Sequence, residues 1–527
     1  MAGFRAPEER RFQMVLFPER LDDVIPADHL VRHVLALFES EALSGSIQAM
    51  ERVYDLARGR PPYHPRYMAA LYVYGMLTGY RSSRQLEDAC HNRIDVRYLM
   101  ECQRPDHATI AEFVVRHGSE LQGLLRDTLT LGRRAGVLKL SRVALDGTKL
   151  KARGSKGSIL RRARIERELE EADREVARLS SEYEENERRE SLTGGLDWGG
   201  DPDKTPAQQK RRFERQQRAL QAALAEFSER QKRSARGSSR VQEQVSVTDP
   251  EARGMAGKDG CFGLHYNAQV AVDVDSGMVV AVDLNDETGD AGQLIPMVEE
   301  IERNCGEKPE AVLADSAYGP GPDLTALEEA GIEGFIAVPE GESIDEEALA
   351  AQRERIAGGE ILTVEEVARM PRGRNGRLHR LCFHYREDED LYVCPLGARL
   401  RFVRTQTQRL KGRKVKRRTY ESEDCSRCPL LASCCGGSKK VRTITRDRHE
   451  GSRQRLRHRM SSERGREIYR ARAPSVEGRI ALMTAVTGRR RVSRFGRAGA
   501  KLEWSLAAIA TNIRVLVSAW QLVKPII

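Results

Sequence analysis

The sequence contains no run of about 18 apolar residues, the length from which a membrane-spanning helix is expected. Its first residues, MAGFRAPEERRFQMVLFPERL, also lack the apolar stretch of a signal peptide. We therefore expect a cytoplasmic protein that does not enter a membrane. Disulfides are rare in that compartment, so the ten cysteines are expected to be thiols, and a clustered subset is better explained by metal binding.

The chain has no excess of acid. Its 88 Lys and Arg residues outnumber its 78 Asp and Glu residues, and the formal net charge is +10. A basic excess favours nucleic acid or another anionic partner, although it does not choose between them. With 40% hydrophobic and 31% charged residues, the composition is that of a folded, charge-rich protein. A length of 527 residues is enough for several domains.

Residues 1–140 have the pattern of a helical domain. Apolar residues recur at helical spacing in DHLVRHVLALFES, at Leu30, Val31, Val34, Leu35 and Leu37. The apolar density of YMAALYVYGMLTGY predicts a buried helix. Ser82 with Gln85, and Thr109 with Glu112, have the spacing of helix-capping boxes. Short capped helices with basic flanks suit either a helix-turn-helix that binds DNA ends or a plain helical bundle.

Strand and helix patterns alternate in the next part of the chain. A β-type run covers 141–152, and two more surround the turn Asp275-Ser276-Gly277. A helix with Asp290 near its start, a strand ending at Asp315, a helix ending at Gly331 and a further strand follow. This alternation predicts an α/β core with a mixed sheet.

Two segments interrupt that rhythm and divide the core into 141–153, 241–340 and 451–527. Residues 154–240 are charged and helix-prone with a thin apolar seam, which predicts a helical hairpin. This hairpin is either a solvated spacer or a surface for DNA contact or dimerisation. Residues 341–450 form a basic, cysteine-containing insertion. The seam consists of Leu160, Ile165, Leu169, Val176 and Leu179.

Two aspartates lie where β-type runs end. VALDGTKLKA carries Asp146, and AVLADSAYG carries Asp315. Strand ends are where α/β sheets usually place their sites, and two neighbouring carboxylates repel unless a proton or cation lies between them. Mg²⁺ and Mn²⁺ favour such oxygen ligands, and a pair of ions can activate one oxygen and stabilise another at phosphorus. Taken singly, each aspartate also suits a turn or a helix cap.

A third carboxylate is available at Glu477. In IYRARAPSVEGRI it follows Tyr469 and Arg472, which helical spacing places near one face, and it comes five residues after Arg472. Nearby alternatives are Glu463, Glu467 and Glu503. Asp273, Asp275 and Asp290 are further acids in the middle region, where turn and cap roles explain them adequately.

These motifs together resemble the DDE transposases of bacterial insertion sequences. The resemblance is greatest to the branch with a helical N-terminal domain and a Tyr-x2-Arg-x4-Glu signature. LDGTKLKA and LADSAYG match its first two catalytic aspartates, and YRARAPSVE matches the signature. HYNAQVAVD and DAGQL match the strand and helix between the two aspartates. The matching pieces run from about Asp28 to Val523.

The resemblance implies a ribonuclease-H-like core in which Asp146, Asp315 and Glu477 bind two Mg²⁺ or Mn²⁺ ions. One departure concerns the lysine that often follows the glutamate, because Thr484 stands at that place. Its DNA contact is expected instead from the acid-free tract GRRRVSRFGRAGAK, which carries Arg489, Arg490, Arg491, Arg494, Arg497 and Lys501.

A second basic tract and a cysteine cluster occupy the later insertion. Cys425-x2-Cys428 has zinc-site spacing, and Cys394 with Cys434 or Cys435 can complete four thiolates. Free thiols in a buried insert are the alternative. RFVRTQTQRLKGRKVKRR holds nine basic residues and no acid, which favours phosphate contacts that position DNA without reading it. Expected DNA contacts are Lys149, Lys151, Arg413, Lys414, Lys416, Arg417, Tyr469, Arg472, Arg489, Arg490 and Arg491.

The resemblance thus implies a transposase that binds the terminal inverted repeats of its own element. It is expected to cleave a phosphodiester at each end and to join the freed 3′ hydroxyl to target DNA. Two ends require a paired complex, so we expect at least a dimer on DNA. A metal-dependent nuclease on the same fold and a non-catalytic DNA-binding descendant are the alternatives.

Overall fold

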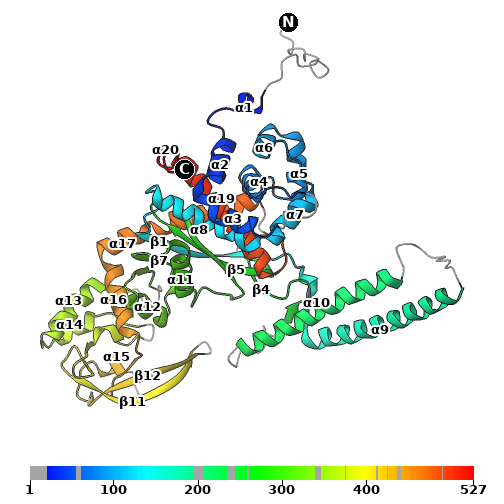
Figure 1. Cartoon of the computed structure of the whole chain (residues 1–527). Helices are drawn as coiled ribbons and strands as arrows, with labels where there is room; N and C mark the ends of the chain where they lie inside the picture. Colours follow the sequence, from blue (N-terminus) through cyan, green and yellow to red (C-terminus); the bar gives the residue numbers. More distant parts are fainter. Residues whose placement is uncertain are drawn as a thin grey trace, which may run out of the picture. The chain divides into compact units, whose positions relative to one another are not determined.

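The computed structural model of the chain describes residues 20–54, 61–193, 206–233, 244–257, 260–338, 346–373, 376–410, 413–423, 425–435, 441–488 and 491–527 (Figure 1). Two compact units contain them. The helical unit comprises the described residues up to Val137, Val486–Gly488 and Ser505–Ile527, and the sheet unit comprises Leu138–Ala485 and Arg489–Trp504. None of the helices in this described part of the chain combines the length and apolar character needed to cross a membrane.

The helical unit confirms the helical pattern of the N-terminal region. Its helices are α1 (Leu21–Val24), α2 (Leu30–Glu39), η2 (Glu41–Leu43), α3 (Ser44–Glu51), α4 (Pro65–Thr78), α5 (Ser83–Asn92), α6 (Ile94–Leu99), α7 (His107–Arg116) and α8 (Gly118–Arg134). Eleven of the fourteen residues of α4 are buried, as the apolar density of its sequence predicts. DNA binding by this unit stays a prediction from the sequence.

One of the two expected capping boxes is confirmed. At α5 the Ser82 side chain accepts a hydrogen bond from the Gln85 N–H, and the Gln85 side chain accepts one from the Ser82 N–H. The box expected from Thr109 is wrong, because α7 begins three residues earlier. The side chain of Asp106 accepts a hydrogen bond from the Thr109 N–H, so Asp106 is the cap and Thr109 lies in the first turn.

The end of the chain differs from its expected place in the core. Helix α19 (Gly496–Ser518) begins in the sheet unit, but its residues from Ser505 onward, with α20 (Trp520–Val523), belong to the helical unit. Every residue from Leu502 to Ile513 is buried. A helix buried on all sides needs helices around it, which explains why this segment joins the all-helical unit.

The sheet unit contains a mixed six-stranded sheet, as expected. The order is β4-β5-β1-β7-β8, and β6 pairs with the remaining length of β5. Strand β1 is antiparallel to β5 and parallel to β7, and β7 is parallel to β8. The strands are β1 (Arg142–Lys151), β4 (Arg253–Ala256), β5 (Phe262–Asp273), β6 (Val279–Asn285), β7 (Ala311–Ala314) and β8 (Glu333–Ile336). Helices α11 (Leu294–Cys305) and α12 (Gly321–Glu329) follow β6 and β7.

The charged segment after β1 forms two long helices that run side by side (Figure 1). They are α9 (Arg162–Thr193) and α10 (Pro206–Arg233), and the short strands β2 (Ile159–Arg161) and β3 (Gln244–Ser246) pair at their base. Leu160, Ile165 and Leu179 of the expected seam are buried. The apolar cluster also includes Leu220, Ala223 and Phe227 from α10, so the pairing of the two helices is hydrophobic.

The cysteine-containing insertion has a sheet and a core of its own. Five strands follow the order β13-β12-β11-β10-β9. They are β9 (His384–Arg386), β10 (Leu391–Val393), β11 (Arg399–Leu410), β12 (Arg413–Ser422) and β13 (Thr443–Arg446). Helices α13 (Glu346–Ala357), α14 (Val364–Arg369) and α15 (Leu431–Cys435) and the short η8 (Arg380–Cys382) accompany them. Three helices follow the insertion: α16 (Glu450–Ser461), α17 (Glu463–Arg470) and α18 (Arg472–Thr487). The signature residues lie on the last two of them.

Candidate active site

Asp146 and Asp315 lie at the same level on neighbouring parallel strands. The register pairs Ala144 of β1 with Leu313 of β7, and each aspartate follows two residues later. Asp315 directly follows the end of β7, but the strand end expected at Asp146 is wrong, because β1 continues to Lys151 in its pairing with β5. Alternate residues of a strand share a face and neighbouring strands lie about 4.8 Å apart, so the register brings the two aspartates together. Asp315 also caps η6 (Ser316–Tyr318) by accepting a 2.8 Å hydrogen bond from Ala317 at Oδ1. The cap role therefore engages one oxygen of this carboxylate.

Three acids, Asp146, Asp290 and Asp315, lie near the buried Tyr318. Burial raises the pKa of the Tyr318 hydroxyl far above its usual value, and the charges of Asp290, Asp146 and Asp315 raise it further. The same hydroxyl donates a hydrogen bond to Oε1 of Gln269 on β5. Three carboxylates therefore lie within electrostatic reach of one phenol, and one of them, Asp290, was expected only to have a turn or cap role.

Asp290 faces the sheet and does not cap a helix. Helix α11 begins only at Leu294, and the carboxylate of Asp290 accepts hydrogen bonds from the side-chain amides of Asn267 (2.9 Å) and Gln269 (2.7 Å) on β5. A Cβ built on Gly147 falls 2.4 Å from Asp290 Oδ1. The cap expectation for Asp290 is therefore wrong, because its side chain packs against the backbone beside Asp146. The alternation of polar Asn267 and Gln269 in YNAQVAVD was the available sequence signal.

Arg472, at the start of α18, pairs with Asp146. Its Nη2 lies 3.1 Å from Asp146 Oδ1, and the two side chains are only 10% and 15% exposed. The Gly147 N–H donates a 2.8 Å hydrogen bond to the same Oδ1. Burial raises the pKa of the neighbouring Tyr469 hydroxyl, Arg472 lowers it, and the charges of Asp315 and Asp146 raise it. The signature Tyr469 and Arg472 therefore lie beside both aspartates.

Glu477 is exposed on α18, whereas Arg472 at the start of the same helix pairs with Asp146. It lies five residues after Arg472, which is about 140° further around the helix. The buried residues of α18 around Glu477 are Arg472, Val476, Ile480 and Met483, so Glu477 projects from the side of that face. Its role as third carboxylate stays a prediction.

The alternative acids have other partners. Oε2 of Glu503 accepts hydrogen bonds from the N–H and hydroxyl of Ser493, at 2.8 and 2.7 Å. Asp273 holds the β5–β6 turn through Ser276, and Asp275 pairs with Arg142. These three acids have structural roles in the turn and in the C-terminal segment. Glu463 and Glu467 are exposed on α17.

The expected DNA-contact residues near the sheet divide by what they touch. Lys149 donates to the Thr288 carbonyl at 3.1 Å, and burial lowers its pKa, so it braces the loop before Asp290. Lys151 is exposed. The Arg491 guanidinium donates to backbone carbonyls of Ala152, Arg153 and Gly154. Arg489 and Arg490 lie outside the described residues, as do the side chains of Arg413 and Lys414.

Two family models match the chain. Residues 393–517 match the Transposase DDE domain, and residues 19–116 match the Transposase domain (DUF772). The chain therefore carries a transposase DDE domain and a second transposase domain. Comparison with curated proteins and with solved structures gave no match. The DDE match covers Tyr469, Arg472 and Glu477 but not the two aspartates, whose pairing rests on the sheet register of the transposase itself. This domain implies a ribonuclease-H-like core, in keeping with the mixed sheet.

The carboxylates of the transposase suit a hard divalent cation. Paired aspartates at one level repel unless a positive charge lies with them, and here the Arg472 guanidinium already supplies one to Asp146. As placed, no three His, Cys, Asp or Glu side chains in the described part of the chain form a group that could hold a metal ion. Carboxylate oxygens are the type of ligand that Mg²⁺ and Mn²⁺ prefer. Of the three expected ligands, Asp146 and Asp315 lie near each other.

Five thiols of the transposase line one small cavity in the cysteine-containing insertion. Cys394, Cys425, Cys428, Cys434 and Cys435 surround a space of about 20 Å³ together with Phe383, Leu400 and Arg442. Burial raises the pKa of Cys394 to about 11 and that of Cys435 to about 12, and neighbouring thiols raise both. The separate sequence halves thus meet, and Cys382 is buried nearby in the same apolar cluster.

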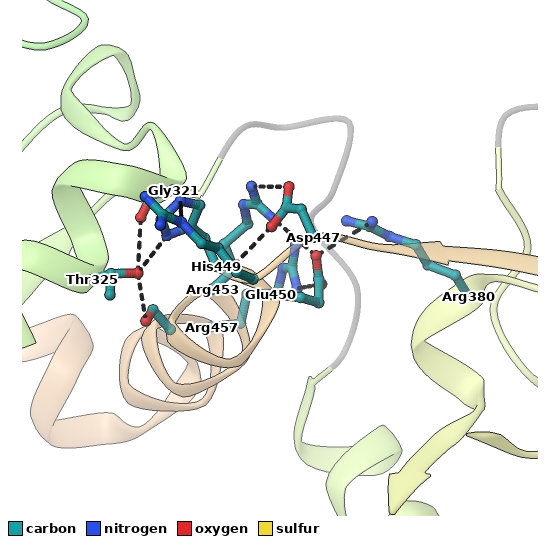
Figure 2. A network of polar contacts seen from close by, with 10 residues as sticks. Gly321, Thr325, Arg380, Asp447, His449, Glu450, Arg453 and Arg457 are labelled. Carbon is teal, nitrogen blue, oxygen red and sulfur yellow. Dashed lines mark hydrogen bonds and ion pairs between the residues drawn. The ribbon is translucent and has the colours of Figure 1, made fainter. Parts of the chain in front are cut away.

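A charged network joins this insertion to α12, the helix that follows Asp315 (Figure 2). Asp447 pairs with Arg453 at 2.8 Å, and Glu450 pairs with Arg453 and Arg457 on α16 and with Arg380 of η8. His449 Nδ1 lies 2.7 Å from Thr325 Oγ1 on α12. Sequence reasoning missed this junction, whose polar groups are spread over three distant segments.

Proposed function

We propose that this transposase moves an insertion sequence by binding its terminal inverted repeats, hydrolysing a phosphodiester at each end and transferring the 3′ hydroxyl to target DNA. The observation that carries the proposal is the pair Asp146 and Asp315, level on parallel strands, with an arginine of the signature on one of them. Asp315 follows the end of β7, which is the usual place for a site in an α/β sheet, and Asp146 lies beside it within β1.

In this proposal Asp146, Asp315 and Glu477 hold two Mg²⁺ or Mn²⁺ ions. When bound, the ions would activate the attacking oxygen and stabilise the leaving 3′ oxygen. Arg472 and Tyr469 would contact the phosphate or brace Asp146, since both already lie against the aspartates. Asp290 supports the site from the β5 side by holding Asn267 and Gln269 against Gly147.

The DNA partner follows from the same activity and from charge. A net charge of +10 and the acid-free tract 401–418 favour contacts with phosphates. The candidates for phosphate contact within the described residues include Lys151, Lys416 and Arg417. Arg491 instead donates hydrogen bonds to the backbone that follows β1. Because two element ends must be cut and joined together, the active form is at least a homodimer on DNA, working in the cytoplasm at the nucleoid.

Zinc is proposed for the thiol cavity. Cys394, Cys425, Cys428 and Cys434 would be four tetrahedral thiolate ligands, and Cys435 would be the thiol left over. A cavity of about 20 Å³ admits one atom-sized occupant, and Phe383, Ala398, Leu400, Ser422 and Arg442 complete its walls. The bound ion would tie β10, the segment after β12 and α15 into one unit.

A strand-transfer assay tests the proposal. The full chain is incubated with Mg²⁺, target plasmid and a duplex that ends in a preformed 3′ hydroxyl of the element. Joined product is expected. Cleavage without joining identifies a nuclease, and binding without either reaction identifies a non-catalytic descendant.

Matched variants assign the chemistry to the site. Asp146→Asn and Asp315→Asn are expected to abolish joining while DNA binding persists. Asp275→Asn is the control, because this aspartate lies in the β5–β6 turn and forms a half-exposed pair with Arg142. Equal joining by Asp146→Asn and Asp275→Asn contradicts the assignment.

A further inference from the structure

The basic tract forms a two-stranded β-ribbon. Strands β11 and β12 pair from Leu400 with Ser422 to Leu410 with Arg413. Strand β10 pairs only with Arg399 and Leu400, and β13 reaches no further than Arg418. Among the described residues, 406–410 and 413–417 therefore pair only with each other, and we call this outer part the ribbon. Figure 1 shows β11 and β12 extending together from the insertion.

The described side chains of the ribbon and its base divide into two chemically different faces. Directly opposed residues share a face, so Gln406 lies with Arg417, and Arg404 lies on the same side two residues earlier. Thr407 lies with Lys416 on the opposite side, together with Thr405. One face therefore carries two guanidiniums, a carboxamide and the apolar Val415. The other carries two short hydroxyls, one ammonium and, at the base, the guanidinium of Arg418 opposite Thr405.

Arg418, at the base of the ribbon, is fixed by the protein itself. It pairs with Asp390 and lies over the rings of Phe402 (4.5 Å) and Tyr420 (5.7 Å). These contacts anchor the ribbon to the sheet of the insertion, where Thr419 and Tyr420 are buried. The base is thus held by side-chain contacts. Next outward, Gln406 and Arg417 are half-buried, and beyond them Thr407 and Lys416 are exposed.

The shape and chemistry fit the major groove of duplex DNA. That groove is about 12 Å wide and admits a two-stranded β-ribbon. Arginine binds the guanine edge and glutamine the adenine edge through paired hydrogen bonds. Lysine also binds guanine but lacks the planar fork of arginine, and threonine offers a single hydroxyl, so the other face is less suited to such pairs. No acid occurs between Arg401 and Tyr420, so nothing on the ribbon repels phosphates. The major groove of an RNA duplex is too deep and narrow for side chains to read.

We propose that the ribbon enters the DNA major groove and reads base sequence through the face formed by Arg404, Gln406 and Arg417. The opposite face, with Thr405, Thr407 and Lys416, then points away from the base edges. Its lysine adds only to the attraction for phosphates. This inference rests on the proposed function and changes the expectation that the tract positions DNA without reading it.

A matched pair of double variants tests the ribbon. Gln406→Ala/Arg417→Ala and Thr407→Ala/Lys416→Ala each remove one positive charge and one polar side chain at a directly opposed pair. Wild type and both variants are used, as full-length chains, to select sequences from a pool of random DNA duplexes, and the affinity for the selected duplex is measured against salt.

Both variants are expected to reduce the salt dependence of binding by about one phosphate contact or less. Only Gln406→Ala/Arg417→Ala should erase contiguous positions of the selected sequence and lower the ratio of specific to non-specific affinity by about tenfold or more. Guanine N7 atoms protected from methylation by wild type should become reactive with this variant alone. Equal effects of the two variants on the selected sequence, or an unchanged sequence in both, overturn the proposal.

Two controls keep the outcomes distinct. Thermal unfolding of each variant must match wild type, and a variant that fails this is replaced by the single change Arg417→Gln or Lys416→Gln. If wild type neither selects a sequence nor joins DNA ends, the proposed function fails. If wild type does both and the ribbon variants select the same sequence, only the ribbon inference fails.

Discussion

Replacing Gly147 with alanine places a methyl group where the site has no room. The new Cβ falls 2.4 Å from Asp290 Oδ1, 3.0 Å from Asp290 Cγ and 3.0 Å from Gln269 Nε2. The carboxylate cannot simply turn away, because Asn267 and Gln269 hold the same Oδ1 with hydrogen bonds of 2.9 and 2.7 Å. Gly147 lies within β1 and has no positive φ, so the conflict is steric and not a matter of backbone conformation.

The loss of stability in Gly147→Ala depends on how far the Asp290 carboxylate must move. Oδ1 must retreat by at least about 0.6 Å to reach the 3.0 Å limit for real contacts. Overpacking of this kind costs about 1–3 kcal/mol, and weakening hydrogen bonds to a carboxylate adds to it. We expect Gly147→Ala to lower the free energy of unfolding by about 2–3 kcal/mol. DNA joining should fall at least about tenfold, because Asp146 is the adjacent residue.

Urea unfolding and the joining assay measure both effects. Gly478→Ala is the control, since nothing lies within 4 Å of its Cβ and the change should stabilise helix α18 slightly. In the double variant Gly147→Ala/Asp290→Ala the steric cost should largely disappear, whereas joining should stay low. A Gly147→Ala protein as stable and active as wild type refutes the packing of Asp290 against β1.

Three other predictions concern separate parts of the molecule. Arg472→Met should reduce joining more than Arg472→Lys, because lysine keeps the charge beside Asp146 but lacks the guanidinium fork; single-turnover joining rates decide this. Metal analysis should find one zinc per chain, and Cys425→Ser/Cys428→Ser should lose it and unfold at lower temperature; equal metal content contradicts the site. Burial lowers the pKa of His449, so its contribution to stability is complete above about pH 6.5 and is lost as the pH falls; His449→Gln should unfold in urea with less dependence on acid, and an unchanged pH slope contradicts this.

The parts of the fold that follow local patterns could be predicted. The apolar density of α4, the turn at Gly277 and the capping box at Ser82 each arise within a few residues. The turn at Gly277 needs its positive φ of 70°, which glycine adopts without strain. Such features are nearly independent of the rest of the chain.

The features that escaped prediction depend on distant partners. Asp290 looked like a helix cap because it precedes α11, but the amides of Asn267 and Gln269, about twenty residues earlier, decide its direction. Thr109 lost its capping role to Asp106, which fixes an earlier helix start. The last helix joined the helical unit because tertiary burial, not sequence order, determines where an apolar helix packs.

The central claim is that Asp146, Asp315 and Glu477 together hold divalent ions, and Mn²⁺ binding tests it most directly. Electron paramagnetic resonance counts Mn²⁺ on the full chain with duplex DNA present, independently of any joining activity. The account predicts that Asp146→Asn, Asp315→Asn and Glu477→Gln each lose Mn²⁺, while Glu503→Gln, whose carboxylate is held by Ser493, binds as wild type does. Unchanged Mn²⁺ binding by Glu477→Gln, or equal loss in Glu503→Gln, would contradict it.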